Sequence, residues 1–201
     1  MTARRLTALL ITLVVVAALW GQFAINGSKP GLENWGWRLW GLMRFFTILT
    51  NALVAVQMGL VALRGRATAD LEATACLNIV MVGIIYHTLL VPEVPFTGAD
   101  WYTDFAFHSL VPVLVPLWFL AFGQKDLRLS HLPLWLIWPL VYCIYAMIRG
   151  ALTGIYPYFF VDVAQYGLPR ILLNIAGLMA VFAIAGLVLW ALARALHRRS
   201  A

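Results

Sequence analysis

Two pairs of polar residues lie four positions apart inside apolar stretches of the sequence. The pairs are Thr47 with Asn51 and Asp104 with His108. Residues four apart share one face of a helix, so each pair would present its groups together. A carboxylate one turn from a histidine can hold the imidazole ring and favour one tautomer, as the aspartate does in hydrolytic triads. The second pair therefore indicates acid–base chemistry.

A proline follows His108 one helical turn later, at Pro112. Proline has no backbone N–H, so the carbonyl four residues before it loses its helical hydrogen bond. That carbonyl belongs to His108. We expect the helix to bend at this histidine.

The elements that must position these groups are predicted to be membrane-spanning helices. The chain has 201 residues, of which 63% are hydrophobic and 11% charged, whereas soluble domains have about 45–50% apolar and about 25% charged residues. A helix needs about 20 mostly apolar residues to cross a bilayer. The sequence therefore predicts an all-α, polytopic membrane protein, a six-helix transmembrane bundle forming one domain over residues 1–201. The predicted spans are residues 6–26, 40–63, 73–91, 104–123, 134–152 and 168–193.

Basic residues are unevenly divided between the two sides of this topology. Nine lie on the side of the termini, namely Arg4, Arg5, Arg64, Arg66, Lys125, Arg128, Arg194, Arg198 and Arg199. The opposite loops hold Lys29 and Arg38, and three further arginines lie within or near span ends on that face. Short loops rich in Lys and Arg stay in the cytoplasm. We therefore expect a multi-pass protein of the cell membrane with both termini cytoplasmic.

The same distribution bears on partners. The formal net charge is +6, but the basic residues sit at helix ends rather than on one face, so we expect the lipid bilayer and no nucleic acid as partner. Cys76 and Cys143 lie in apolar runs, where we expect no disulfide. The sequence predicts no particular oligomeric state.

The first span resembles a signal peptide in one respect, because Arg4 and Arg5 precede its apolar run. The run is long for a signal sequence, and it ends at residues 20–23 without a small-residue cleavage site. We interpret it as a retained first span.

Several polar residues are predicted at one depth of the bilayer. At a rise of about 1.5 Å per residue, Thr47 and Asn51 on the second span and His108 on the fourth lie toward the non-cytoplasmic face. The third, fifth and sixth spans place at this level His87, Tyr145, Arg149, Arg170 and Asn174. Ionisable groups within spans are costly and mark functional sites. We expect these groups to converge on one cavity in the outer leaflet.

Some of these residues also have purely structural explanations. Taken alone, Thr47 would donate its hydroxyl to the carbonyl of Met43, one turn earlier. Arg149 and Arg170 would extend toward the outer headgroups. His87 would belong to the packing of its helix, and its part in a site stays open.

Five motifs, running from the second span to the start of the sixth, resemble the androgen-induced gene 1 family. They are residues 44–51 (RFFTILTN), 104–109 (DFAFHS) with Pro112 and Pro116, 139–142 (PLVY), Arg149-Gly150, and 156–160 (YPYFF). This family includes the androgen-dependent TFPI-regulating protein and bacterial members often called Pr6Pr membrane proteins.

The resemblance implies a six-helix membrane hydrolase without a cofactor, which cleaves fatty acid esters of hydroxy fatty acids with a threonine nucleophile and a histidine base. Carried onto this sequence, the nucleophile is Thr47 and the base is His108. Asp104 would then orient the base. Asn51, Tyr145 and Arg149 are candidate donors to the oxyanion, and Arg149 is alternatively a ligand for a substrate carboxylate. Residues 156–160 are a candidate lid. The identity of the substrate stays open between a fatty acid ester of a hydroxy fatty acid and another lipid ester.

Two other classes of protein compete with the hydrolase. His87 and His108 could both ligate a haem iron or help to hold zinc in a membrane redox protein. A carrier or binding protein for lipids or small solutes is the second alternative, because glycine and proline interrupt several spans. Retinal binding is not expected, because the lysines, Lys29 and Lys125, are both in loops.

Overall fold

The computed structural model describes residues 1–200, with side chains as far as Arg198, so the side chain of Arg199 lies outside the described part. Within that part the chain forms helices and no strands. The α-helices are α1 (Ala3–Asn26), α2 (Trp35–Leu42), α3 (Phe46–Arg64), α4 (Ala69–Ile85), α5 (Gly98–Phe105), α6 (Val111–Phe122), α7 (Leu132–Thr153), α8 (Val163–Tyr166) and α9 (Leu168–Ser200). Shorter turns are the π-helical η1 (Tyr86–Leu90) and η2 (Ala106–Leu110) and the 3₁₀ turns η3 (Leu129–His131) and η4 (Phe159–Val161).

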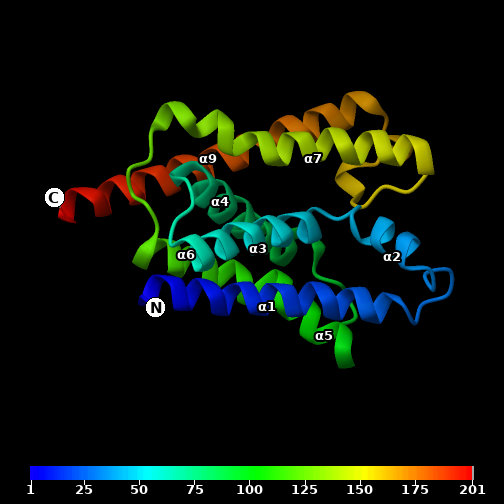
Figure 1. The fold of residues 1–201 in the computed structure, drawn as a ribbon. Coiled ribbons are helices and arrows are strands. Elements are labelled where there is room, and N and C mark those ends of the chain that lie inside the picture. The colour runs from blue at the N-terminus through cyan, green and yellow to red at the C-terminus, as the bar shows by residue number, and fades with distance from the viewer. Residues whose placement is uncertain (201) are drawn as a thin grey trace.

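In the described part of the chain, six helical segments are long and apolar enough to cross a membrane, which confirms the predicted number. They are Ala3–Asn26, Phe46–Arg64, Ala69–Leu90, Gly98–Phe122, Leu129–Thr153 and Leu168–Arg198. Figure 1 shows them running lengthwise beside one another, with both termini at one end, the terminal end, and α2 and α5 at the other, the site end. The chain thus has the fold of an all-α, multi-pass membrane bundle.

The predicted second span, 40–63, is wrong as one continuous helix. The chain leaves helical geometry at residues 43–45, between α2 and α3. Three carbonyls beside this break are engaged by side chains of α7: Tyr142 Oη donates to Arg44 O at 2.8 Å, Tyr145 Oη donates to Met43 O at 3.1 Å, and Arg149 donates to Trp40 O. Backbone polar groups at membrane depth need such partners, so α7 stabilises the break.

The third and fourth spans each contain a π-helical turn at the site end. In the fourth span, Val111 N donates to Ala106 O, five residues earlier, and Pro112 follows directly. The π-helical turn η2 lies at the place where the sequence predicted a bend. This turn connects α5 directly to α6, so the fourth span begins at Gly98 rather than at residue 104. Single π-helical turns inside α-helices often occur at functional sites.

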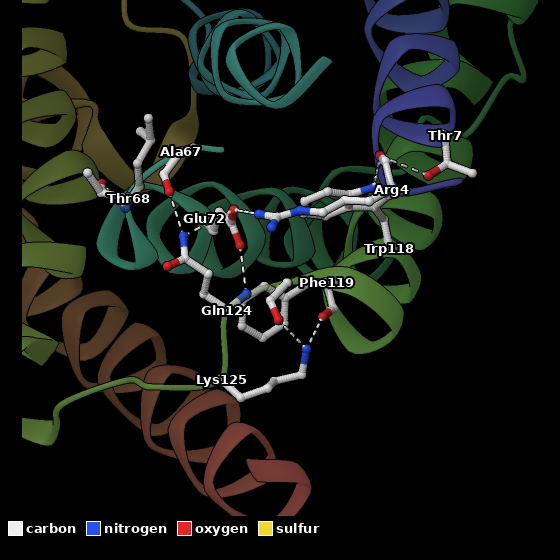
Figure 2. Close-up of polar contacts among 11 residues, drawn as sticks. Arg4, Thr7, Ala67, Thr68, Glu72, Trp118, Phe119, Gln124 and Lys125 are labelled. Atoms are coloured by element: carbon white, nitrogen blue, oxygen red, sulfur yellow. Dashed lines mark hydrogen bonds and ion pairs between the residues drawn. The ribbon is translucent and has the colours of Figure 1, made fainter. Parts of the chain in front are cut away.

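A polar cluster connects the helices at the terminal end of the bundle (Figure 2). It consists of Arg4, Glu72, Gln124 and Lys125 and is here called the terminal clasp. The buried carboxylate of Glu72 pairs with Arg4 Nη2 at 2.6 Å and accepts from Gln124 N at 2.8 Å. Lys125 Nζ donates to Phe119 O at 2.5 Å and so caps the end of α6. A buried carboxylate needs such partners, and here they connect α1, α4 and the chain after α6.

Candidate active site

Thr47, His108 and Asp104 form a hydrogen-bonded row at the site end, here called the Thr–His–Asp triad. Thr47 Oγ1 lies 3.2 Å from His108 Nε2, and His108 Nδ1 lies 2.9 Å from Asp104 Oδ1. The side chains of His108 and Asp104 are only 15% and 20% exposed. The triad therefore combines a hydroxyl, an imidazole and a carboxylate in the order that nucleophilic catalysis uses.

The break before α3 determines where the hydroxyl of Thr47 points. Thr47 is the second residue of α3, and the first backbone hydrogen bond of this helix joins Leu49 N to Phe45 O. The carbonyl of Met43, which a continuous helix would offer to Thr47, accepts from Tyr145 instead. The hydroxyl of Thr47 therefore does not donate to the carbonyl of Met43, as the purely structural explanation would require, and it faces His108 instead.

Tyr86 is a member of the site that the sequence interpretation missed. Its ring stacks on the imidazole of His108, with centroids 3.7 Å apart and planes at 8°, and its hydroxyl donates to Asp104 Oδ2 at 2.8 Å. Tyr86 thereby contacts two members of the triad. The sequence interpretation selected the neighbouring His87 because it is ionisable, but consecutive helical positions face different directions. The sequence did contain a signal for Tyr86, because this tyrosine lies at the same bilayer depth as His87, where the site was predicted.

Tyr158 reaches the triad from the segment between α7 and α9. Its hydroxyl accepts from Phe46 N at 3.1 Å and lies beside the amide and hydroxyl of Thr47. Burial raises the pKa of Tyr158, so the phenol stays protonated near neutral pH. Asn174 holds this segment, because its Nδ2 donates to Phe160 O at 3.2 Å. Asn174 therefore contributes through the segment and not through the triad.

The triad opens into a cavity of about 410 Å³, here called the triad cavity. Besides the triad, its lining includes polar groups of α1, the following loop and α5, namely Gln22, Asn26 and the ion pair of Lys29 with Asp100. Most of the remaining lining is apolar: Leu42, Phe45, Ile48, Leu90, Pro92, Phe96, Phe107 and Pro157. A molecule with a polar head and an apolar body matches this lining.

A second, smaller hollow of about 30 Å³ also reaches Thr47. It is lined almost entirely by apolar side chains of α3, α4, α7 and α9, including Phe46, Val82, Leu178 and Phe182. Thr47 thus lies between a partly polar cavity and an apolar slot. An ester whose carbonyl carbon rests at Thr47 has space for an apolar chain in the triad cavity and for only the first carbons of a second chain in the slot.

Tyr145 and Arg149, expected at the same cavity, do not line it. Arg149 Nη1 donates to Tyr145 Oη at 2.6 Å, and the guanidinium lies over the ring of Trp40 at 3.8 Å from its centroid. Both residues face the break before α3, and Arg149 also lines a separate cavity. The expected convergence of all polar groups on one cavity is therefore wrong for this pair, because the freed carbonyls of the break engage them.

Three other predicted site residues also lie away from the cavities at Thr47. Asn51 is fully buried, and its Nδ2 donates back to Thr47 O at 2.9 Å, which supports the first turn of α3. His87 is exposed and pairs through Nε2 with Ser109 Oγ at 3.1 Å. Arg170 is exposed near the start of α9. The structure brings together Thr47, Asp104 and His108, and adds Tyr86 and Tyr158.

The arrangement does not favour paired axial histidines. Both ring nitrogens of His108 are engaged, by Thr47 and Asp104, while His87 is turned toward Ser109. Over the described residues, no group of three or more His, Cys, Asp or Glu side chains is placed to hold a metal ion. The geometry of these side chains fits proton transfer better than ligation.

Comparison of the chain with models of known protein families, with curated proteins and with solved structures finds no match.

Proposed function

We propose that this protein is an intramembrane threonine hydrolase that cleaves lipid esters, with Thr47 as nucleophile and His108 as base. The observation that carries the proposal is the 3.2 Å contact between Thr47 Oγ1 and His108 Nε2, with Asp104 Oδ1 2.9 Å from Nδ1 on the other side of the ring. A threonine hydroxyl is a weak nucleophile until a base accepts its proton. The triad supplies this base together with a group that orients it.

The reaction proceeds through an acyl-enzyme. Thr47 Oγ1 attacks the ester carbonyl carbon while His108 Nε2 takes the hydroxyl proton. The tetrahedral intermediate collapses, the carbon–oxygen bond to the alcohol breaks, and the alcohol leaves with the proton from His108. Water then attacks the acyl carbon while His108 takes a proton from it. The bond from this carbon to Thr47 Oγ1 breaks as His108 returns the proton to Oγ1, which releases the fatty acid and restores the hydroxyl. Asp104 stabilises the imidazolium in both halves.

The negative charge on the carbonyl oxygen develops beside the first turn of α3. The amides of this turn precede the first helical hydrogen bond, so they lie outside the ladder of α3. Ile48, whose amide is in this turn, lines the triad cavity together with Thr47 and Tyr158. An amide at a helix N-terminus and the protonated phenol of Tyr158 are donors of the kind that stabilises an oxyanion. These groups replace Asn51, Tyr145 and Arg149 in that role.

The two hollows at Thr47 and the family resemblance together support a lipid ester as substrate. The triad cavity takes the polar part and one chain, the apolar slot takes the start of the other chain, and residues 156–160 act as a lid through Tyr158. Within this class, the resemblance favours fatty acid esters of hydroxy fatty acids. No cofactor takes part in this chemistry.

The nucleophile and base are tested by single substitutions in the full chain. Thr47→Ala and His108→Ala are expected to abolish labelling by a fluorophosphonate serine-hydrolase probe and to lower hydrolysis of a fatty acid ester of a hydroxy fatty acid on the order of 10³-fold or more. Each has a matched control at the same level of the bundle. Thr88→Ala and His87→Ala remove the same groups from exposed positions outside both hollows and are expected to keep labelling and hydrolysis.

Retained labelling and hydrolysis in Thr47→Ala or His108→Ala would refute the assigned roles. Lipid binding or movement without cleavage by the wild-type protein would instead assign the fold to a carrier. Membrane extraction and size-exclusion profiles of each variant show that the comparison is between folded proteins.

We further propose that the protein lies in the cell membrane with both termini in the cytoplasm, which places the triad in the outer leaflet. The support is the excess of Lys and Arg on the side of the termini. The triad lies at the opposite end of the bundle.

A further inference from the structure

A separate cavity of about 260 Å³ lies between α2 and α7, and none of its lining residues lines the triad cavity. Arg44 and Arg149 both line it, with Trp37 and Trp40 beside them. It is here called the two-arginine cavity. Its function does not follow from the hydrolase chemistry, because neither arginine contacts the triad.

The two-arginine cavity has excess positive charge. No carboxylate lines it, and neither arginine has an ion pair with a described residue. Glu33, an acidic residue before α2, accepts from Gly31 N at 3.1 Å and is exposed. Two like charges in one partly buried space repel each other. The charges of the cavity are therefore unbalanced without an anion.

Arg44 is the more available of the two side chains. Its Nε is buried and has no hydrogen-bond partner, which is costly for a charged group. Burial, and then the charge of Arg149, lowers the pKa of Arg44. Arg149 is already oriented by Tyr145 Oη, by Trp40 O and by the Trp40 ring. One fixed guanidinium and one whose Nε has no hydrogen-bond partner thus line the same space.

We propose that the two-arginine cavity binds a phosphate group, supplied by the headgroup of an anionic lipid. Two guanidiniums offer more donors than one carboxylate can accept, and phosphate with its additional oxygens uses them better. The lipid source is favoured by Trp35, Trp37 and Trp40 of α2, whose side chains are exposed and of which Trp37 and Trp40 line the cavity. Tryptophans in this arrangement are typical of the headgroup level. A phosphate there would also neutralise the charges beside the break that positions Thr47.

The proposal is tested with the full-length protein in dodecyl maltoside, by following its Tm with added phosphatidylglycerol, phosphatidylcholine or inorganic phosphate. Phosphatidylglycerol at roughly tenfold its dissociation constant is expected to raise the Tm of the wild type by about 4 °C. Arg44→Gln removes a binding group and is expected to lose this rise. Leu32→Glu places a carboxylate in the lining and is expected to lose it by internal neutralisation. Arg170→Gln removes an exposed arginine as a matched control and is expected to keep it.

Each outcome decides the proposal. A rise with phosphatidylglycerol alone, lost in Arg44→Gln and Leu32→Glu, supports the lipid headgroup. An equal rise with inorganic phosphate, lost in the same variants, supports a phosphate site with a soluble source. No rise with either phosphate source, an equal rise with phosphatidylcholine, or a rise that persists in the cavity variants overturns the proposal. If Arg44→Gln does not fold, Leu32→Glu makes the same decision.

Discussion

At the scale of single residues, the two ring nitrogens of His108 have different partners. Asp104 can only accept hydrogen bonds when ionised, so Nδ1 carries the proton and Nε2 is left to accept from Thr47. Tyr86 adds a stacked ring and a hydrogen bond to the far oxygen of the carboxylate. The carboxylate is therefore held from both sides, and it fixes the tautomer in which His108 can take a proton.

Asp104→Asn tests this tautomer argument. An asparagine of the same shape can donate to Nδ1, which places the imidazole proton on Nε2, where it no longer accepts from Thr47. We expect kcat for ester hydrolysis to fall on the order of 10²–10⁴-fold, by analogy with aspartate replacement in serine-protease triads. Asp126→Asn, which changes an exposed aspartate outside both hollows at Thr47, is the matched control. Equal activity of the two variants would remove Asp104 from the site.

At the scale of elements, the site depends on places where helices depart from regular geometry. Thr47 follows the break before α3, Tyr86 begins η1, and His108 lies in η2. Side chains of α7 and Tyr158 satisfy the backbone groups around the break. Arg149 and Tyr145 thus act on Thr47 through the backbone, which makes them positioning residues in the proposed mechanism.

The sequence was sufficient for the number of spans and for the pairing of Asp104 with His108, because hydrophobicity and helical periodicity are local signals. It was insufficient for the break at residues 43–45, which contain neither glycine nor proline. The partners that stabilise this break, such as Tyr142 and Tyr158, lie about a hundred positions away in the chain. Tyr86 was missed because the stacking of its ring on an imidazole of another helix produces no recognisable spacing pattern in the sequence.

Gly83→Ala tests how closely α4 must approach the π-helical turn of His108. An added Cβ would lie 2.8 Å from Pro112 Cβ and 3.3 Å from His108 O. Relief of this overlap moves α4 away from η2, with an expected loss of about 1–3 kcal/mol of stability and a fall in hydrolysis. Gly177→Ala, with nothing within 4 Å of its added Cβ, is the control and is expected to be neutral or slightly stabilising. Full activity and an unchanged Tm in Gly83→Ala would contradict this dependence.

At the scale of the whole molecule, the two ends of the bundle differ in chemistry. The terminal end holds the terminal clasp, in which Arg4 and Glu72 are paired (Figure 2). The site end holds the triad, its cavity and the two-arginine cavity. Because both termini lie at one end (Figure 1), one measurement of orientation assigns all of these features to a side of the membrane.

The orientation is tested with a matched pair of serines at opposite ends. Ser28 follows α1 at the site end and Ser130 precedes α7 at the terminal end, and both are exposed. The native Cys76 and Cys143 are buried, so they contribute little background. With the termini in the cytoplasm, a membrane-impermeant maleimide labels Ser28→Cys in intact cells and labels Ser130→Cys only after permeabilisation. The reverse pattern would place the triad at the cytoplasmic face, and its lipid substrate would then come from the inner leaflet.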